Sequence, residues 1–138
     1  MKLSVKSDYA VRAVLAMARR PAGEITRVET LAAEGGLPPN YLVQILIELK
    51  ATGLVRSVRG KEGGYQLARP AAEITFGDVL RAIHGPLFDS PAMGDDRCPP
   101  ELREAWRRLQ AAVEREAAAI NFQQLLENGA ERNRMFYI

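Results

Sequence analysis

Apolar residues recur with a helical period through most of residues 1–85. In four segments they return every three or four positions, which is the spacing that gives a helix one buried face. Between the third and fourth segments, two short runs typical of β-strands, at 54–59 and 65–67, flank a glycine-rich stretch, which predicts a β-hairpin. The predicted helices cover about residues 4–20, 28–34, 39–52 and 76–84.

Small polar residues and glycines mark the predicted helix ends. A side-chain oxygen of Ser4 or Ser7 can accept a hydrogen bond at the start of the first helix, and Thr75 can do so for the fourth. Gly35-Gly36 ends the second helix, because glycine adopts the left-handed conformation without a steric penalty. A short turn therefore joins the second helix to the third, as in a helix-turn-helix.

The segment after residue 85 has a different composition. Residues 86–100 hold four prolines and the acidic pair Asp95-Asp96, so we expect a long loop there. A long helix is predicted from near Glu101, with apolar residues at spacings of 4, 3, 4, 4 and 3 that are typical of a coiled-coil seam. The seam consists of Leu102, Trp106, Leu109, Val113, Ala117 and Ile120.

A break in this helix is predicted at Asn121. Asn121 followed three residues later by Gln124 resembles a capping box, which indicates a new helix start. We expect a short final helix over 122–128, ended by Gly129, and we assign no structure to 130–138. The predicted fold class is mostly α with a small β-hairpin wing: a winged helix-turn-helix domain followed by a long C-terminal dimerisation helix.

Charge is unevenly distributed along the chain. Residues 1–70 carry 11 Lys and Arg against 6 Asp and Glu, a balance of +5, whereas residues 71–138 carry 8 against 11, a balance of −3. A basic first half suits a polyanion, and an acidic second half suits assembly or sensing. The net charge of +2 does not by itself identify a nucleic-acid-binding protein.

The order of helix, turn, helix and hairpin would place the third helix in the major groove of DNA, with the hairpin beside it as a wing. Amide and phenol groups in the first turns of that helix can contact base edges or phosphates, and Gln44 can bond adenine twice. Cations around the glycine tip suit phosphates or a narrow minor groove, and glycines let the backbone approach the duplex. The candidate DNA contacts are Lys2, Ser4, Lys6, Asn40, Tyr41, Gln44, Arg56, Ser57, Arg59, Gly60, Lys61, Gly63 and Gly64.

The sequence is also compatible with other functions. The winged domain can instead bind a protein partner, Tyr41 can simply cover the core, and a basic hairpin tip can be a solvated turn. An enzyme is the weaker alternative, because one histidine, one cysteine and no phosphate-binding motif leave little catalytic material. Only a dyad of Cys98 with His84 is conceivable.

The single cysteine, Cys98, excludes a disulfide within the chain and indicates a reducing compartment. No signal-like apolar region follows Met1, and no apolar run approaches the ~18 residues of a membrane span. We therefore expect a cytoplasmic protein that has no membrane partner.

The motifs of the first 85 residues resemble those of the Rrf2 family of bacterial transcription regulators. The run from Gly53 to Gly60, GLVRSVRG, and the run that begins at Gly63, GGYQLA, are specific. The length of the chain and its long helix after residue 100 are also similar to the family. The other matching motifs are Tyr9-Ala10-Val11, Tyr41-Leu42 with Gln44 and Leu49, and Ile74 to Val79.

The resemblance implies a homodimer that reads a roughly palindromic operator in double-stranded DNA. It places Arg59 in the minor groove and adds Val43, which offers only apolar contact, for example to a thymine methyl. The implied major-groove residues are Asn40, Tyr41, Val43 and Gln44, and the implied dimer interface is Leu102, Trp106, Leu109, Val113 and Ile120. We divide the chain into a DNA-binding domain at 1–85, a sensor-type loop at 86–100, dimerisation helices at 101–128 and a tail at 129–138.

Many members of this family carry three cysteines in the loop before the dimer helix, where they hold an iron–sulfur cluster. Here only Cys98 lies in the matching loop, whereas a cluster usually needs four ligands. Some members recruit a carboxylate or a histidine from the partner's first helix. Asp8 occupies such a position, but Arg12 one turn later is no metal ligand. The cofactor is therefore unknown, and Cys98 is either inert, a redox-sensing thiol, or a ligand of a cluster or metal.

Overall fold

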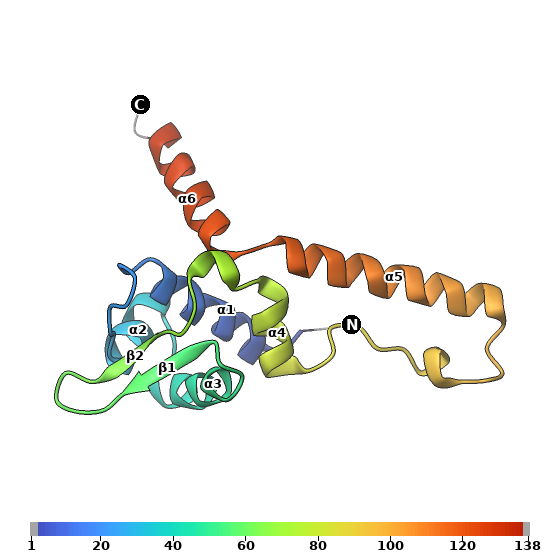
Figure 1. The fold of residues 1–138 in the computed structure, drawn as a ribbon, viewed down its shortest axis with the longest axis horizontal. Coiled ribbons are helices and arrows are strands. Elements are labelled where there is room, and N and C mark those ends of the chain that lie inside the picture. Colours follow the sequence, from blue (N-terminus) through green and yellow to red (C-terminus); the bar gives the residue numbers. More distant parts are fainter. Residues whose placement is uncertain (1–2, 137–138) are drawn as a thin grey trace.

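The computed structural model describes residues 3–136, most of which are helical (Figure 1). A compact N-terminal part contains four helices and a two-stranded hairpin, and a long helix extends away from it. The last helix starts against the N-terminal part and projects in another direction. The elements are α1 (Val5–Ala18), α2 (Val28–Gly35), α3 (Pro39–Ala51), β1 (Val55–Val58), β2 (Gly64–Leu67), η1 (Ala71–Glu73), α4 (Phe76–His84), η2 (Pro91–Gly94), α5 (Pro100–Ala119) and α6 (Phe122–Phe136).

Helix α1 is the centre of the N-terminal part and packs against α2, α3, α4 and α6. Alanines on its buried side, such as Ala10 and Ala13, let the neighbouring helices approach closely. Leu31 of α2 and Leu42 and Ile45 of α3 are fully buried against it. Burial of each large apolar side chain stabilises the fold by roughly 1.5–3 kcal/mol, so this core determines where α3 is held.

The predicted helix ends are confirmed. Ser4 Oγ accepts a hydrogen bond from the backbone N–H of Ser7 at 3.2 Å and caps α1. Gly36 ends α2 with a left-handed φ of 64°. Thr75 and Asp78 form a reciprocal capping box at the start of α4, with bonds of 3.1 and 3.0 Å.

The predicted hairpin is also confirmed, with a small shift of its ends. Its strands pair antiparallel, so that Val55 faces Leu67 and Val58 faces Gly64. Gly64 therefore belongs to the second strand and not to the loop.

The predicted break between the last two helices occurs at Ile120 and Asn121. Asn121 Oδ1 accepts a hydrogen bond from the backbone N–H of Gln124 at 2.8 Å. The backbone N–H of Phe76 donates to the Ile120 carbonyl at 2.8 Å, and the N–H of Phe122 donates to the Ile74 carbonyl at 3.1 Å. These two bonds attach the break to the start of α4.

The predicted end of the last helix at Gly129 is wrong, because α6 continues to Phe136. A glycine inside a helix costs only about 1 kcal/mol relative to alanine, and the surrounding Glu127, Ala130, Glu131 and Arg132 are good helix formers. The stretch 130–136, to which the sequence assigned no structure, is therefore helical.

The predicted loop over residues 86–100 is confirmed, and part of it packs against the helices. It contains the short turn η2, and Leu87 and Phe88 within it are buried. The ring of Phe88 packs on Trp106 of α5, with centroids 6.0 Å apart. The loop therefore connects α4 to α5 through side-chain packing as well as through the chain.

Candidate nucleic-acid interface

Helices α2 and α3 form a helix-turn-helix through the residues between them, Gly36 to Pro38. Leu37 is buried in this turn and packs closely on Gly35. Pro39 occupies the first turn of α3, where its missing N–H has no intrahelical partner. The turn holds α3 with its apolar side against the core and its other side exposed.

The exposed side of α3 carries the residues predicted to read bases. Asn40, Tyr41 and Gln44 are exposed in the first turns, and Val43 is half-buried. The ring of Tyr41 meets that of Tyr9 of α1 edge to face, with centroids 5.6 Å apart and an interplanar angle of 86°. Because Tyr41 remains 40% exposed, it both covers α1 and stays accessible.

The tip of the wing, residues 59–63, depends on glycine. Gly60 has a φ of 113°, which L side chains rarely adopt. The N–H of Gly63 donates to the Gly60 carbonyl at 3.0 Å and closes the turn. A Cβ at Gly63 would lie 2.2 Å from the Val58 carbonyl oxygen. The turn itself therefore requires both glycines, whatever the wing binds.

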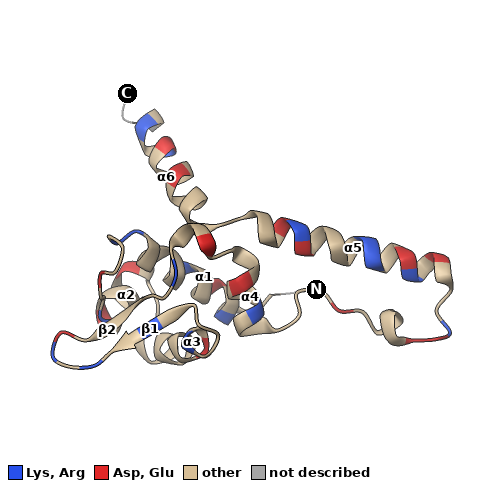
Figure 2. Cartoon of the chain, in the orientation of Figure 1, with Lys and Arg blue, Asp and Glu red and all other residues tan. Residues whose placement is uncertain are grey.

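Cations are exposed along the wing (Figure 2). Arg56 donates Nη2 to the Ala68 carbonyl at 3.1 Å, which ties its side chain to the end of the hairpin. Arg59 and Lys61 at the tip form no ion pair among residues 3–136, and Ser57 is exposed nearby on β1. Residues 59–63 carry these two cations against the acidic Glu62, a balance of +1, and this net positive charge suits a polyanion.

The predicted contacts near the start of α1 have partners within the chain. Ser4 caps the helix, and Lys6 Nζ pairs with Glu48 Oε1 of α3 at 2.5 Å. The ion pair links α1 to α3 and neutralises the charge of Lys6. Lys2 lies outside the described residues.

Two residues outside the predicted DNA contacts, Thr26 and Arg27, support the wing. Thr26 and Tyr65 exchange two backbone hydrogen bonds of 2.8 Å each, so an isolated β-bridge joins the residues before α2 to β2. Arg27 donates Nη2 to the Lys61 carbonyl at the wing tip. The segments joined by the Arg27 bond lie 34 residues apart, and only the folded structure brings them together.

Of the two candidate ligands, Cys98 is buried and Asp8 is paired with a cation. Cys98 is 9% exposed in the loop before α5, and the Asp8 carboxylate forms an ion pair with Arg12 at 2.9 Å. Among residues 3–136, no group of three or more His, Cys, Asp or Glu side chains is placed to hold a metal ion. One buried thiol and one paired carboxylate do not match the four-ligand set of an iron–sulfur cluster. The residues of a single chain therefore do not fit that group.

The predicted dimer residues on α5 fall into two groups. Leu102 and Leu109 are exposed, at 47% and 48%. The others are partly covered within the chain, Trp106 by Phe88 and Val113 by the cluster around Leu87. The half-buried seam residues are Trp106, Val113 and Ile120. The large apolar side chains that α5 leaves exposed are therefore limited to Leu102 and Leu109, which are fewer than the residues of the predicted seam.

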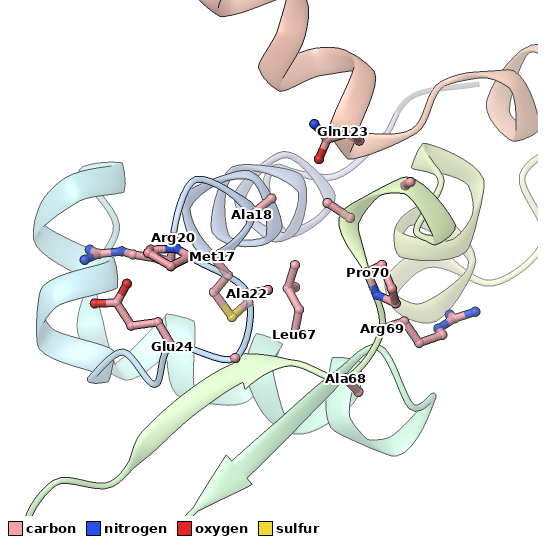
Figure 3. A pocket seen from close by; sticks show the side chains of 14 residues that line it. Met17, Ala18, Arg20, Ala22, Glu24, Leu67, Ala68, Arg69, Pro70 and Gln123 are labelled. Carbon is pink, nitrogen blue, oxygen red and sulfur yellow. The ribbon is translucent and has the colours of Figure 1, made fainter.

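A surface pocket and the character of the helices bear on whether the chain is an enzyme or has a membrane partner. A pocket of about 490 Å³ lies between the end of α1 and its following loop on one side and β2, η1 and the start of α6 on the other (Figure 3). Its walls include Met17, Ala22 and Leu67, with Gln123 above them, and neither histidine nor cysteine lines it. Within the described part of the chain, no helix is both long and apolar enough to cross a membrane.

Known proteins match the chain over most of its length. The profile of the Rrf2 family, described as an iron-dependent transcriptional regulator, matches residues 3–128. An HTH-type transcriptional regulator of Mycobacterium tuberculosis is 44% identical over 118 residues, which cover 82% of this chain and 73% of that protein. The HTH-type transcriptional regulator CymR of Bacillus subtilis is 31% identical over 140 residues, covering 100% of both chains.

Solved structures agree with this assignment. The structure of CymR, described as the global cysteine regulator of B. subtilis, has a TM-score of 0.82 at 30% identity and covers 93% of this chain and 98% of that one. IscR of T. potens has a TM-score of 0.79 at 28% identity and covers 99% and 97%. The predicted fold class is confirmed, and the relatives are regulators and not enzymes. This chain belongs to the Rrf2 family and is a transcriptional regulator with a winged helix-turn-helix fold.

Proposed function

We propose that this regulator binds a roughly palindromic operator as a homodimer, with one winged domain on each half-site. The observation that carries the proposal is the exposure of polar side chains on α3 together with unpaired cations on the wing that follows it. Gln44 represents the first set, and Arg59 and Lys61 represent the second.

Helix α3 supplies base recognition in this proposal. The amide of Gln44 can form two hydrogen bonds with adenine, a contact that contributes about 1–3 kcal/mol of discrimination. Asn40 and Tyr41 add polar groups beside it, and Val43 offers its methyl groups to a thymine. The contact with Tyr9 restricts the ring of Tyr41 before DNA binds, which lowers the entropy lost on binding.

The wing supplies contacts with the DNA backbone and the minor groove. The negative potential of a narrow minor groove attracts arginine, which suits Arg59, and Lys61 suits a nearby phosphate. The glycines of the tip leave its backbone uncovered, so it can approach the duplex closely. These contacts add affinity and register, whereas α3 adds sequence specificity.

Helix α5 supplies the proposed dimer interface. It extends away from the winged domain, so the second copy can reach it without touching α3 (Figure 1). Leu102 and Leu109 lie two turns apart on one side of α5, and Ala105 and Ala112 beside them permit close approach of a second helix. A two-fold dimer of this kind matches an operator with two-fold symmetry.

Selection of duplexes from a random-sequence pool tests this function. The wild-type protein should enrich inverted repeats whose half-site centres lie about 34–36 Å apart, or a multiple of that distance. The variant Gln44→Ala should bind the enriched duplex at least about fivefold more weakly, since it loses a base contact. Gln124→Ala, which removes an exposed amide on α6, is the matched control and should bind like the wild type. Failure to enrich any sequence would favour a winged domain that binds protein.

Burial favours the inert role for Cys98 over the redox and ligand roles, since a buried thiol is shielded from oxidants and electrophiles. We propose that the protein acts in the cytoplasm, where bacterial DNA is found. We also propose that it does not sense its signal through an iron–sulfur cluster bound by the residues of a single chain.

A further inference from the structure

We propose that Arg27, which belongs to neither the recognition helix nor the wing, is a positioning residue that holds the wing ready for DNA. The proposal rests on the DNA-binding function proposed above. Arg27 immediately precedes α2, and its side chain reaches across to the wing tip.

The residues before α2 run along the outer strand of the hairpin and bind it at three levels. We call residues 23–27 the strap. Near the base of the wing, Gln66 donates Nε2 to the Gly23 carbonyl at 3.4 Å. In the middle, the Thr26 and Tyr65 backbones exchange their two bonds. At the tip, Arg27 donates to the Lys61 carbonyl.

The strap fits the wing too closely for a side chain in between. A Cβ at Gly64 would lie 2.3 Å from the Thr26 carbonyl oxygen. Gly64 therefore lets β2 approach the strap, and the backbone bonds of Thr26 fix the lower part of the wing. Beyond this point only the tip, residues 59–63, extends without a neighbouring strand.

Arg27 is what secures that tip. Among the hydrogen bonds of residues 3–136, its bond to Lys61 is the one that a side chain outside the hairpin makes to residues 59–63. An isolated two-stranded hairpin is marginally stable, so a tip without this bond samples more conformations. If the tip is already ordered in the free protein, less conformational entropy is lost when Arg59 and Lys61 bind the duplex.

The experiment compares Arg27→Gln with Arg132→Gln, which removes one exposed cation from α6, far from the wing. In the free protein, the Gly63 amide, which is bonded to the Gly60 carbonyl, should exchange its hydrogen about fivefold faster in Arg27→Gln, as expected for loss of one ordinary hydrogen bond. Exchange at the buried Leu46 should not change. Affinity for a duplex selected by the wild type should fall about fivefold, with an unchanged slope of log affinity against log salt. Arg132→Gln should match the wild type throughout.

Unchanged exchange at Gly63 in Arg27→Gln would overturn the proposal. A loss of affinity with a shallower salt slope and unchanged exchange would also overturn it, because Arg27 would then be a phosphate contact. If the wild type selects no duplex, the proposed DNA-binding function fails, but hydrogen exchange in the free protein still decides whether Arg27 holds the tip.

Discussion

The ring of Phe122 stacks on that of Phe76, with centroids 5.9 Å apart and planes inclined by 20°. Phe76 is the first residue of α4 and Phe122 the first residue of α6, and two backbone hydrogen bonds flank the pair. Phe122 is fully buried. The C-terminal helices are therefore anchored in the core of the winged domain. Because the same core supports α3, a substitution that disturbs this anchor also alters the packing beneath α3.

Truncating Phe122 should destabilise the whole protein. Phe122→Ala removes a fully buried ring and should lower the free energy of unfolding by about 3–5 kcal/mol, measured by urea denaturation. Met135→Ala, at a side chain that is 74% exposed on the same helix, should stay within about 0.5 kcal/mol of the wild type. Equal effects of the two substitutions would show that α6 is not anchored through Phe122.

Charge on the open side of α5 should separate the subunits. Leu102→Asp combined with Leu109→Asp places two carboxylates on the proposed interface, where burial without partners is costly. Sedimentation velocity should show a monomer. The far-UV circular dichroism of this variant should match the wild type, because the helix content is unchanged. Glu104→Ala, at another exposed position of α5, should leave the dimer intact. A dimer that survives both aspartates places the interface elsewhere.

A methyl group at Gly64 should disturb the contact between the strap and the wing. Gly64→Ala puts a Cβ against the Thr26 carbonyl oxygen, so β2 or the strap must shift, at a cost of about 1–3 kcal/mol in the free energy of unfolding. Gly94→Ala is the matched control, because its Cβ meets nothing within 4 Å. If thermal or urea unfolding cannot distinguish the two variants, the close fit of strap and wing is not rigid.

Cys98 should react slowly in the native protein. Its side chain is buried within the loop before α5, so alkylation by iodoacetamide should be much slower in the folded state than in urea. Protein purified without oxygen should lack iron and the visible absorption of a cluster, while still binding DNA. A coloured, iron-containing protein would show that the two copies together supply ligands that one chain does not.

Features fixed by neighbours in the chain could be predicted from the sequence. The Thr75–Asp78 capping box, the glycine at the end of α2 and the break at Asn121 all depend on residues a few positions apart. The exposed residues of α3, such as Gln44, followed from helical periodicity in the same way.

Contacts between distant segments could not be predicted. The bonds of Lys6 with Glu48 and of Arg27 with Lys61 need the tertiary fold, because exposed charged residues carry no pattern that names a partner. The continuation of α6 through Gly129 departs from the prediction because several good helix formers around this glycine outweigh its cost of about 1 kcal/mol.

The dependence of DNA binding on salt tests the central claim most directly. The affinity of the wild type and of Arg59→Gln for the selected inverted repeat is measured by fluorescence anisotropy between about 50 and 200 mM salt, the range over which phosphate contacts change affinity strongly. The wild type should lose affinity steeply, and Arg59→Gln should bind more weakly with a slope smaller by about 1 for each subunit. If Arg59→Gln keeps the wild-type affinity at every salt concentration, the wing does not contact DNA.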